Sequence, residues 1–170
     1  MNILEESEME KLKAVSDIIK QNQDNTDGLD VVFLDFDGVL NIPKDHQFIL
    51  GESECMSHLN ELCLSRNLGI VLTTSWRNFG EDYCDNYLYE HGLNKQIKVI
   101  SQTPDVDWNN RYNEIVAWIV EHDNLRRFVI LDDIEMRTLG AFAIRCDYEY
   151  GFDHEGLINA LNIIDSEALM

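Results

Sequence analysis

The chain has 170 residues, 45% of them hydrophobic, which is typical of one globular domain with a sizeable core. Its formal net charge of −19 comes from 32 acidic and 13 basic residues, and disfavours a general nucleic-acid-binding surface while leaving room for a local basic groove. No apolar run approaches the roughly 20 residues of a membrane span, the acidic start is not a secretory signal, and the four cysteines form no Cys-x-x-Cys pair. We therefore expect a cytoplasmic protein with free thiols, no zinc site and no membrane partner.

In chain order, helices alternate with short apolar strands. A helix is expected over residues 5–21, and the polar, turn-forming segment 22–28 reads as a linker. We therefore divide the chain into an N-terminal helix and linker, residues 1–28, and a catalytic domain, residues 29–170. The first helix could pack back on the domain, mediate oligomerisation or hold a partner.

Within the domain, strands and helices are predicted in alternation. The predicted strands cover 31–34, 70–73, 97–100, 128–131 and 141–145. The predicted helices cover 52–66, 80–91 and 111–122, with a last helix capped by Asp153, and 41–51 is expected to be an irregular flap. Because the strands are apolar throughout rather than alternating, they predict a parallel sheet covered on both faces, in a three-layer α/β Rossmann-like fold.

The first predicted strand carries the most informative motif. Its apolar run ends in Asp35 and Asp37, and Gly38 then permits a sharp turn. Side chains at i and i+2 of an extended strand point the same way, so both carboxylates can face one site. Ligands of open α/β sheets bind outside the carboxyl ends of strands, and a cation there would relieve the repulsion between the two acids.

Two further strands also end in polar groups. Thr73-Thr74-Ser75-Trp76-Arg77 follows the second strand, and Asp132-Asp133 follows the fourth. Turn chemistry alone explains any one of these strand ends. Three strands that deliver polar groups to the same edge of one sheet indicate a catalytic site.

The order of these groups resembles that of the haloacid dehalogenase (HAD) superfamily over residues 31 to about 165. The resemblance implies that Asp35 is a nucleophile that forms an aspartyl-phosphate and that Asp37 is the general acid/base. Family members that act on carbon–halogen bonds lack an acid at the second position, so Asp37 points to phosphoryl transfer.

The same resemblance implies a hydroxyl and a cation that bind the phosphoryl group. Thr73 is the expected hydroxyl, although Thr74 and Ser75 leave open which one serves. Arg111, at the start of a predicted helix, is the expected cation. Three other basic residues compete for this role: Lys95, Lys98 and Arg77.

A magnesium site is also implied by the resemblance. Asp132-Asp133 is similar to the family's Asp-Asp variant, and with Asp35 and the backbone carbonyl of Asp37 it would hold Mg²⁺, which prefers hard oxygen ligands. Asp133 is the firmer expected ligand, and Asp132 could instead support it.

The segments that separate these motifs are short. Each is filled by one helix–strand unit and a short flap, which leaves no room for the cap domain that many HAD enzymes close over small substrates. We therefore expect an open, capless site for a bulky phosphorylated substrate, such as a polymer or a protein. Thr74, Trp76 and Arg77 are expected to bind it, the tryptophan by stacking and the arginine by charge.

Four strings, 72–77, 116–119, 131–133 and 151–157, look like the small capless HAD group that includes domains linked to RNA repair proteins. That likeness implies the terminal phosphate of a nucleic acid as a candidate substrate, and the net charge counts against it. Two other functions stay open: a receiver-like signalling domain, which the order of the acids disfavours, and a catalytically idle HAD-like binding module.

Overall fold

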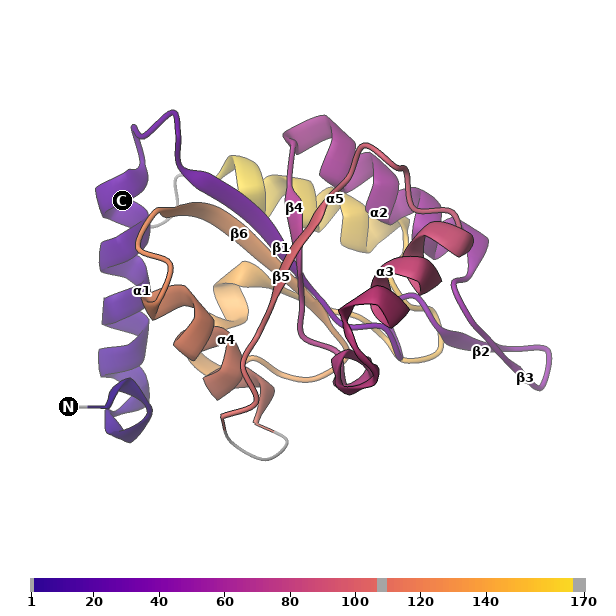
Figure 1. The fold of residues 1–170 in the computed structure, drawn as a ribbon, viewed down its shortest axis with the longest axis horizontal. Helices are drawn as coiled ribbons and strands as arrows, with labels where there is room; N and C mark the ends of the chain where they lie inside the picture. The colour runs from indigo at the N-terminus through magenta and orange to yellow at the C-terminus, as the bar shows by residue number, and fades with distance from the viewer. Residues whose placement is uncertain (1, 107–109, 167–170) are drawn as a thin grey trace.

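The computed structural model describes residues 2–106 and 110–166, with only the backbone of Glu81 (Figure 1). In this part of the chain, five parallel strands form one sheet in the order β5-β4-β1-β6-β7. The strands are β1 (Leu29–Leu34), β4 (Gly69–Leu72), β5 (Val99–Gln102), β6 (Leu125–Asp132) and β7 (Ala143–Arg145). The α-helices are α1 (Glu8–Asn22), α2 (Ser53–Arg66), α3 (Glu81–Glu90), α4 (Arg111–Val120) and α5 (His154–Asp165). Short 3₁₀ helices are η1 (Ile3–Glu5), η2 (Ser75–Phe79) and η3 (Arg137–Phe142).

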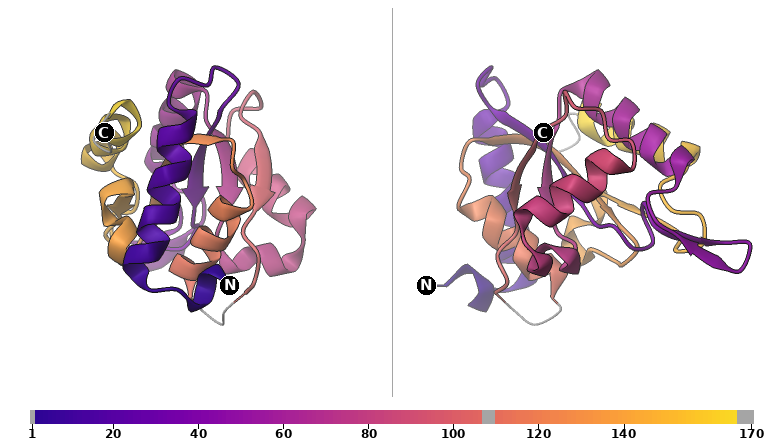
Figure 2. Two further views of the ribbon diagram at one scale, coloured as in Figure 1. Left: turned by 90° about the vertical axis from the view of Figure 1, so that its left-hand side faces the viewer. Right: turned by 45° about the vertical axis from the view of Figure 1, so that its right-hand side comes forward.

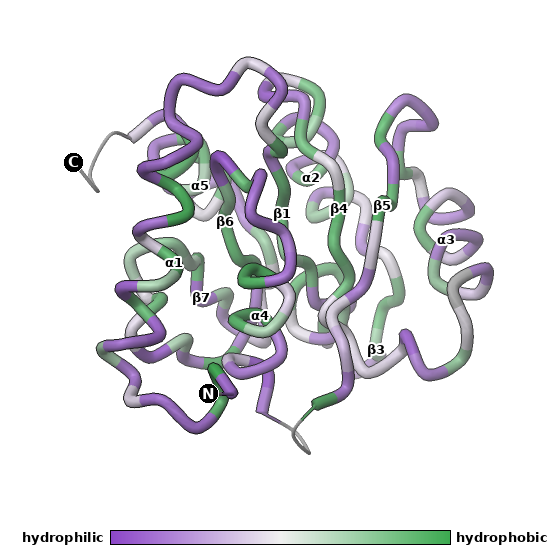
Figure 3. Tube along the Cα trace, turned by 60° about the vertical axis from the view of Figure 1, so that its left-hand side comes forward, coloured by the Kyte–Doolittle hydropathy of each residue, from purple (hydrophilic) through white to green (hydrophobic). Residues whose placement is uncertain are grey.

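The sheet is buried on both faces, as its apolar strands predict. Successive residues of β1 point to opposite sides, so Val32 and Leu34 pack with α2, α3 and α5, whereas Val31 and Phe33 pack with α1, α4 and η3. The apolar stretches of the central strands β1, β4 and β6 are accordingly green in Figure 3, which colours the chain by hydropathy. The predicted α/β Rossmann-like architecture is confirmed.

The flap after β1 is more regular than expected. It forms an antiparallel hairpin of β2 (Ile42–Lys44) and β3 (Gln47–Ile49), which projects from the body of the molecule (Figure 1; Figure 2, right). Its two turn residues, Asp45 and His46, have φ angles of 53° and 65°. Two-residue hairpin turns of this kind usually contain Asn-Gly or Asp-Gly, and neither dipeptide occurs at residues 45–46.

The N-terminal helix packs back on the domain. Val15 of α1 is fully buried in the core under the sheet, and Asn22 at its end donates hydrogen bonds to the carbonyl oxygens of Asp123 and Leu125, at 2.6 and 2.9 Å. Lys11 Nζ donates to Asn113 Oδ1 of α4 at 3.0 Å. These contacts show that the helix packs on the domain, which is one of the three roles considered for it.

Two expectations about composition can be compared with the structure. The four cysteines are buried and free, and burial raises the pKa of their thiols, that of Cys84 to about 11. None of the described helices is long and apolar enough to cross a membrane.

Candidate active site

The predicted site residues meet at the carboxyl edge of the sheet because the three central strands end level with one another. Leu34 of β1 aligns with Leu72 of β4 and with Leu131 of β6. The next residues along the three chains are therefore brought to one edge: Asp35 after β1, Thr73 after β4 and Asp132 at the end of β6. Backbone hydrogen bonds fix the first two, since Asp35 N donates to Leu131 O and Thr73 N donates to Leu34 O.

Three carboxylates converge at this edge. Oxygen atoms of Asp35, Asp132 and Asp133 lie within 4.8 Å of one another. The side chain of Asp132 is fully buried and that of Asp35 is 7% exposed. Gly38 makes the close approach of the β1 loop possible: it has φ +80°, and a Cβ there would lie 2.8 Å from Asp133 Oδ2.

Arg111 is the cation that the structure brings to this cluster. Its Nη1 lies 3.0 Å from Asp35 Oδ2 and 2.8 Å from Asp132 Oδ2. It reaches them from the first turn of α4, which begins at this residue. The competing lysines, Lys95 and Lys98, are exposed before β5 begins, at the other end of the sheet.

One guanidinium does not neutralise the cluster. Burial raises the pKa of the Asp35 carboxyl, and Arg111 only partly offsets this. Burial also raises the pKa of Asp132, and the nearby charge of Asp35 raises it further. Buried carboxylates this close together need more positive charge to ionise, so the cluster fits a divalent cation held by hard oxygen ligands.

Two polar atoms at this edge, Thr73 Oγ1 and Arg111 Nε, are buried and have no hydrogen-bond partner within the described part of the chain. Buried polar groups are rarely left unsatisfied without a functional reason. The neighbouring Thr74 Oγ1 accepts a hydrogen bond from Trp76 N at 3.2 Å and so caps η2. Of these two threonine hydroxyls, that of Thr73 is the one with no partner among the described residues.

Asp37 is held by two donors, one on each carboxylate oxygen. Trp76 Nε1 donates to Oδ2 at 3.2 Å, and Asn41 Nδ2 donates to Oδ1 at 2.9 Å. Asn41 is itself fixed, because its Oδ1 accepts from the backbone N–H of Gly51 and from the hydroxyl of Tyr87. The sequence analysis did not find Asn41 or Tyr87. Asn41 stands four residues after Asp37, beyond the Gly38 turn, and that spacing is the signal that could have identified it.

A family model described as the HAD domain in Swiss Army Knife RNA repair proteins matches residues 31–157, three quarters of the chain. The chain belongs to this HAD family. Comparison with curated proteins and with solved structures finds no match. The resemblance drawn from the strand-end motifs is thereby confirmed, and the matched segment contains every candidate site residue named above.

Arg77 of this HAD domain was expected to contact substrate, but its side chain is buried inside the protein. Its side chain is 6% exposed and donates to the carbonyl oxygens of Thr73, Thr74 and Thr103, at 2.7, 2.9 and 3.2 Å. Its remaining terminal nitrogen forms an ion pair with the buried Glu114 of α4. Four of its five donors are therefore engaged, and the residue holds the end of β4 instead of facing solvent.

Two of the three residues predicted to bind substrate are buried in this HAD domain and have partners inside the protein. Arg77 is a support for the loop that carries Thr73, and Thr74 is a helix cap, since both are buried with internal partners. Trp76 alone of the three is half-buried beside Asp37. The burial of Arg77 could not be predicted from its neighbours in sequence, because its ion-pair partner Glu114 comes 37 residues later.

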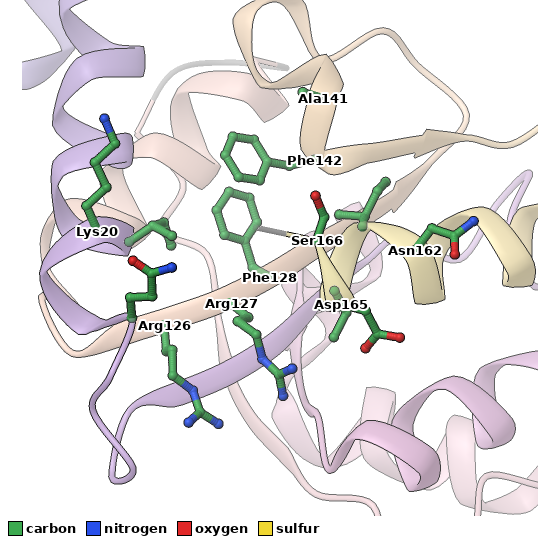
Figure 4. A pocket seen from close by; sticks show the side chains of 13 residues that line it. Lys20, Arg126, Arg127, Phe128, Ala141, Phe142, Asn162, Asp165 and Ser166 are labelled. Atoms are coloured by element: carbon green, nitrogen blue, oxygen red, sulfur yellow. The ribbon is translucent and has the colours of Figure 1, made fainter. Parts of the chain in front are cut away.

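A separate cavity of about 450 Å³ lies at the amino end of β6, between α1 and α5 (Figure 4). Phe128 and Phe142 stack in its lining with ring centroids 4.4 Å apart. It contains none of the residues of the acidic cluster. This cavity therefore lies apart from the acidic cluster, at the other end of the sheet.

Proposed function

We propose that this HAD domain is a Mg²⁺-dependent phosphohydrolase that transfers the phosphoryl group of a phosphate monoester first to Asp35 and then to water. The observation that carries the proposal is the meeting, at one edge, of three clustered carboxylates, a bridging Arg111 and the unpartnered hydroxyl of Thr73. An idle binding module would have no need to keep buried acids and an unsatisfied hydroxyl together, since both reduce stability.

In the first step, a carboxylate oxygen of Asp35 attacks phosphorus and the bond from phosphorus to the leaving oxygen breaks. Asp37 in its protonated form gives its proton to that leaving oxygen. The donors on both Asp37 oxygens, Trp76 Nε1 and Asn41 Nδ2, fix the direction of the carboxyl group. The product of this step is an aspartyl-phosphate and an alcohol.

In the second step, Asp37 takes a proton from a water molecule as the water oxygen attacks the same phosphorus. The bond to the Asp35 oxygen breaks, which restores the carboxylate and releases inorganic phosphate. Thr73 Oγ1 donates a hydrogen bond to a phosphoryl oxygen, and Arg111 balances negative charge on the transferred group.

The residues that would hold Mg²⁺ are Asp35, Asp132 and Asp133, with the backbone carbonyl of Asp37 as a further oxygen ligand. Asp132 already accepts from Arg111 and from the backbone N–H of Ile134, so Asp133 has more of its ligand capacity available. When bound, the cation would neutralise charge on the phosphoryl oxygens and on the acids around it.

The substrate that we propose is the phosphorylated end of a polymer, and specifically of a nucleic acid. Two findings support this: the family description refers to RNA repair proteins, and the described residues of the inter-motif segments form the hairpin β2–β3 and helix–strand units but no cap. A small metabolite would contribute little binding energy at such an open site, so a larger partner is better suited to it.

The test of the catalytic proposal is release of inorganic phosphate from a generic aryl phosphate, with Mg²⁺ and with EDTA. Wild-type protein should turn over only with Mg²⁺, and Asp35→Asn should abolish turnover while a cooperative melting transition shows that the fold persists. Asp24→Asn makes the same chemical change at an exposed position and is the matched control. Undiminished turnover by Asp35→Asn, or no turnover by the wild type, would overturn the proposal.

A further inference from the structure

Exposed aromatic side chains gather at the catalytic edge of the sheet. Within the described residues, the aromatic side chains that are largely exposed are Phe48, Phe79, Tyr83, Tyr148 and Tyr150. Each lies on a segment that follows the carboxyl end of β1, β4 or β7. Some exposed aliphatic residues lie at this edge as well, namely Leu50, Val106 and Ile134, whereas others lie elsewhere, such as Leu64 on α2. Grouped exposed aromatic rings mark interaction sites more often than single ones do.

Three aromatic rings form a continuous row that starts at the general acid. Trp76 donates to Asp37 and lies with its ring centroid 6.1 Å from that of Tyr83. The Tyr83 ring lies 5.2 Å from that of Phe79, whose side chain is 69% exposed. The inner side of Trp76 is occupied by Phe36 and Tyr87. The row therefore runs from the catalytic carboxylate outward over η2 and α3.

We propose that Trp76, Tyr83 and Phe79 form a stacking strip for the unpaired bases of a single-stranded nucleic acid whose terminal phosphate enters the catalytic site. This rests on the proposed function and extends it, because it names the form of substrate and the residues that select it. Base–aromatic stacking tolerates any sequence, since every base has a π-face.

The negative charge of the domain favours binding by base stacking over binding by neutralisation of the phosphate backbone. The domain carries −19, and Arg77, the basic residue nearest to the strip in sequence, is buried against Glu114. Arg77 therefore offers no exposed charge to a phosphate backbone beside Tyr83 and Phe79. Stacking, unlike backbone neutralisation, releases no condensed counterions, so it can operate on an acidic protein.

The row also distinguishes a single strand from other polymers. In a duplex the bases are paired and stacked on one another, so their faces are not available to the strip. A phosphopeptide offers a flat ring only where its sequence happens to have one, whereas every nucleotide supplies one. A row of three aromatic rings therefore suits a strand whose successive nucleotides each supply a base for stacking.

The experiment compares catalytic efficiency on a small alkyl phosphate with that on end-phosphorylated oligoadenylates of increasing length, using phosphate release as the readout. Efficiency should rise with each of the first few nucleotides. Phe79→Ala and Tyr83→Ala should each lower kcat/KM on the longer oligonucleotides by roughly 5- to 100-fold. Neither should change it on the alkyl phosphate. Met9→Ala, which removes an exposed apolar side chain on the other face of the sheet, should change nothing.

A binding measurement keeps this inference separate from the catalytic one. In the Asp35→Asn background, fluorescence anisotropy gives the Kd of a labelled, end-phosphorylated oligoadenylate without turnover. Phe79→Ala should weaken that Kd by a similar factor, and raising the salt concentration from 50 to 200 mM should not weaken binding, since few phosphates are neutralised.

Several results would overturn the stacking strip. They are equal Kd values for Phe79→Ala and its parent, no binding of the oligonucleotide by the parent, affinity that falls steeply with salt, or equal efficiency on duplex and single-stranded ends. Loss of turnover on every substrate with Phe79-dependent binding intact would instead count against the catalytic proposal alone.

Discussion

Replacing Arg77 by methionine separates the two roles that this residue has been assigned. The change leaves the carboxylate of Glu114 buried without its partner and removes the donors to the carbonyl oxygens of Thr73, Thr74 and Thr103. Breaking a buried ion pair by removing one partner costs about 3–5 kcal/mol, and both side chains here are only 6% exposed. At about 2–4 °C per kcal/mol for a chain of this size, the melting temperature should fall by about 6–20 °C.

The assay is thermal unfolding followed by circular dichroism, with phosphate release measured below the transition. Arg77→Met should lower kcat more than it raises KM, because the loop that carries Thr73 loses its support. The double variant with Glu114→Gln removes the buried charge as well, so it should recover part of the lost stability. A melting temperature within about 2 °C of the wild type, combined with a raised KM, would refute this reasoning and restore Arg77 as a substrate contact.

Three further predictions concern acids. Asp37→Asn should lower turnover by roughly 10²- to 10⁴-fold with little change in melting temperature, as steady-state kinetics and a melt would show. Asp133→Asn should raise the melting temperature in EDTA, because it relieves repulsion among the clustered acids, and should abolish the stabilisation that added Mg²⁺ gives the wild type. Burial opposes ionisation of Asp30, but hydrogen bonds from Arg126 and Arg127 hold its pKa below the usual value of 3.8. Because the pKa of Asp30 is depressed in the folded state, its ion pairs stabilise the fold above pH 3.8, and this stabilisation is lost as the pH falls further. Asp30→Asn should therefore lower the free energy of unfolding at pH 7. The difference from the wild type should shrink below pH 3.8, as denaturant melts at a series of pH values would show.

The elements that were predicted well are those whose signal is local. β1 and β6 read as buried strands because apolar residues run without interruption up to the acids at 35 and 132, and the parallel arrangement then follows from the helices between them. In a parallel sheet the carboxyl ends of all strands lie at the same edge. The convergence of Asp35, Thr73 and Asp132 could therefore be predicted from the strand ends alone.

The features that were missed depend on contacts distant in sequence. The hairpin β2–β3 turns through Asp45 and His46, two non-glycine residues with positive φ, in place of the Asn-Gly or Asp-Gly dipeptide that marks such turns most strongly. The burial of Arg77 is decided by Glu114 on another helix, and nothing within a few residues of Thr73 reveals it. Strand-end hydroxyls also look alike in sequence, and only the folded chain shows that Thr74 Oγ1 caps η2 while the buried Thr73 Oγ1 has no partner among the described residues.

Helix α1 has a bearing on the site although it lies outside the segment that matches the family. It packs on α4, where Lys11 Nζ donates to Asn113 Oδ1, two residues after the start of that helix at Arg111. The first turn of α4 is thus held between α1 on one side and the acids Asp35 and Asp132 on the other. Since Arg111 lies within hydrogen-bonding distance of both acids, a shift of about 1 Å in the placement of this turn would change the balance of charge at Asp35 and Asp132. The N-terminal helix therefore helps to position Arg111 through its packing on α4.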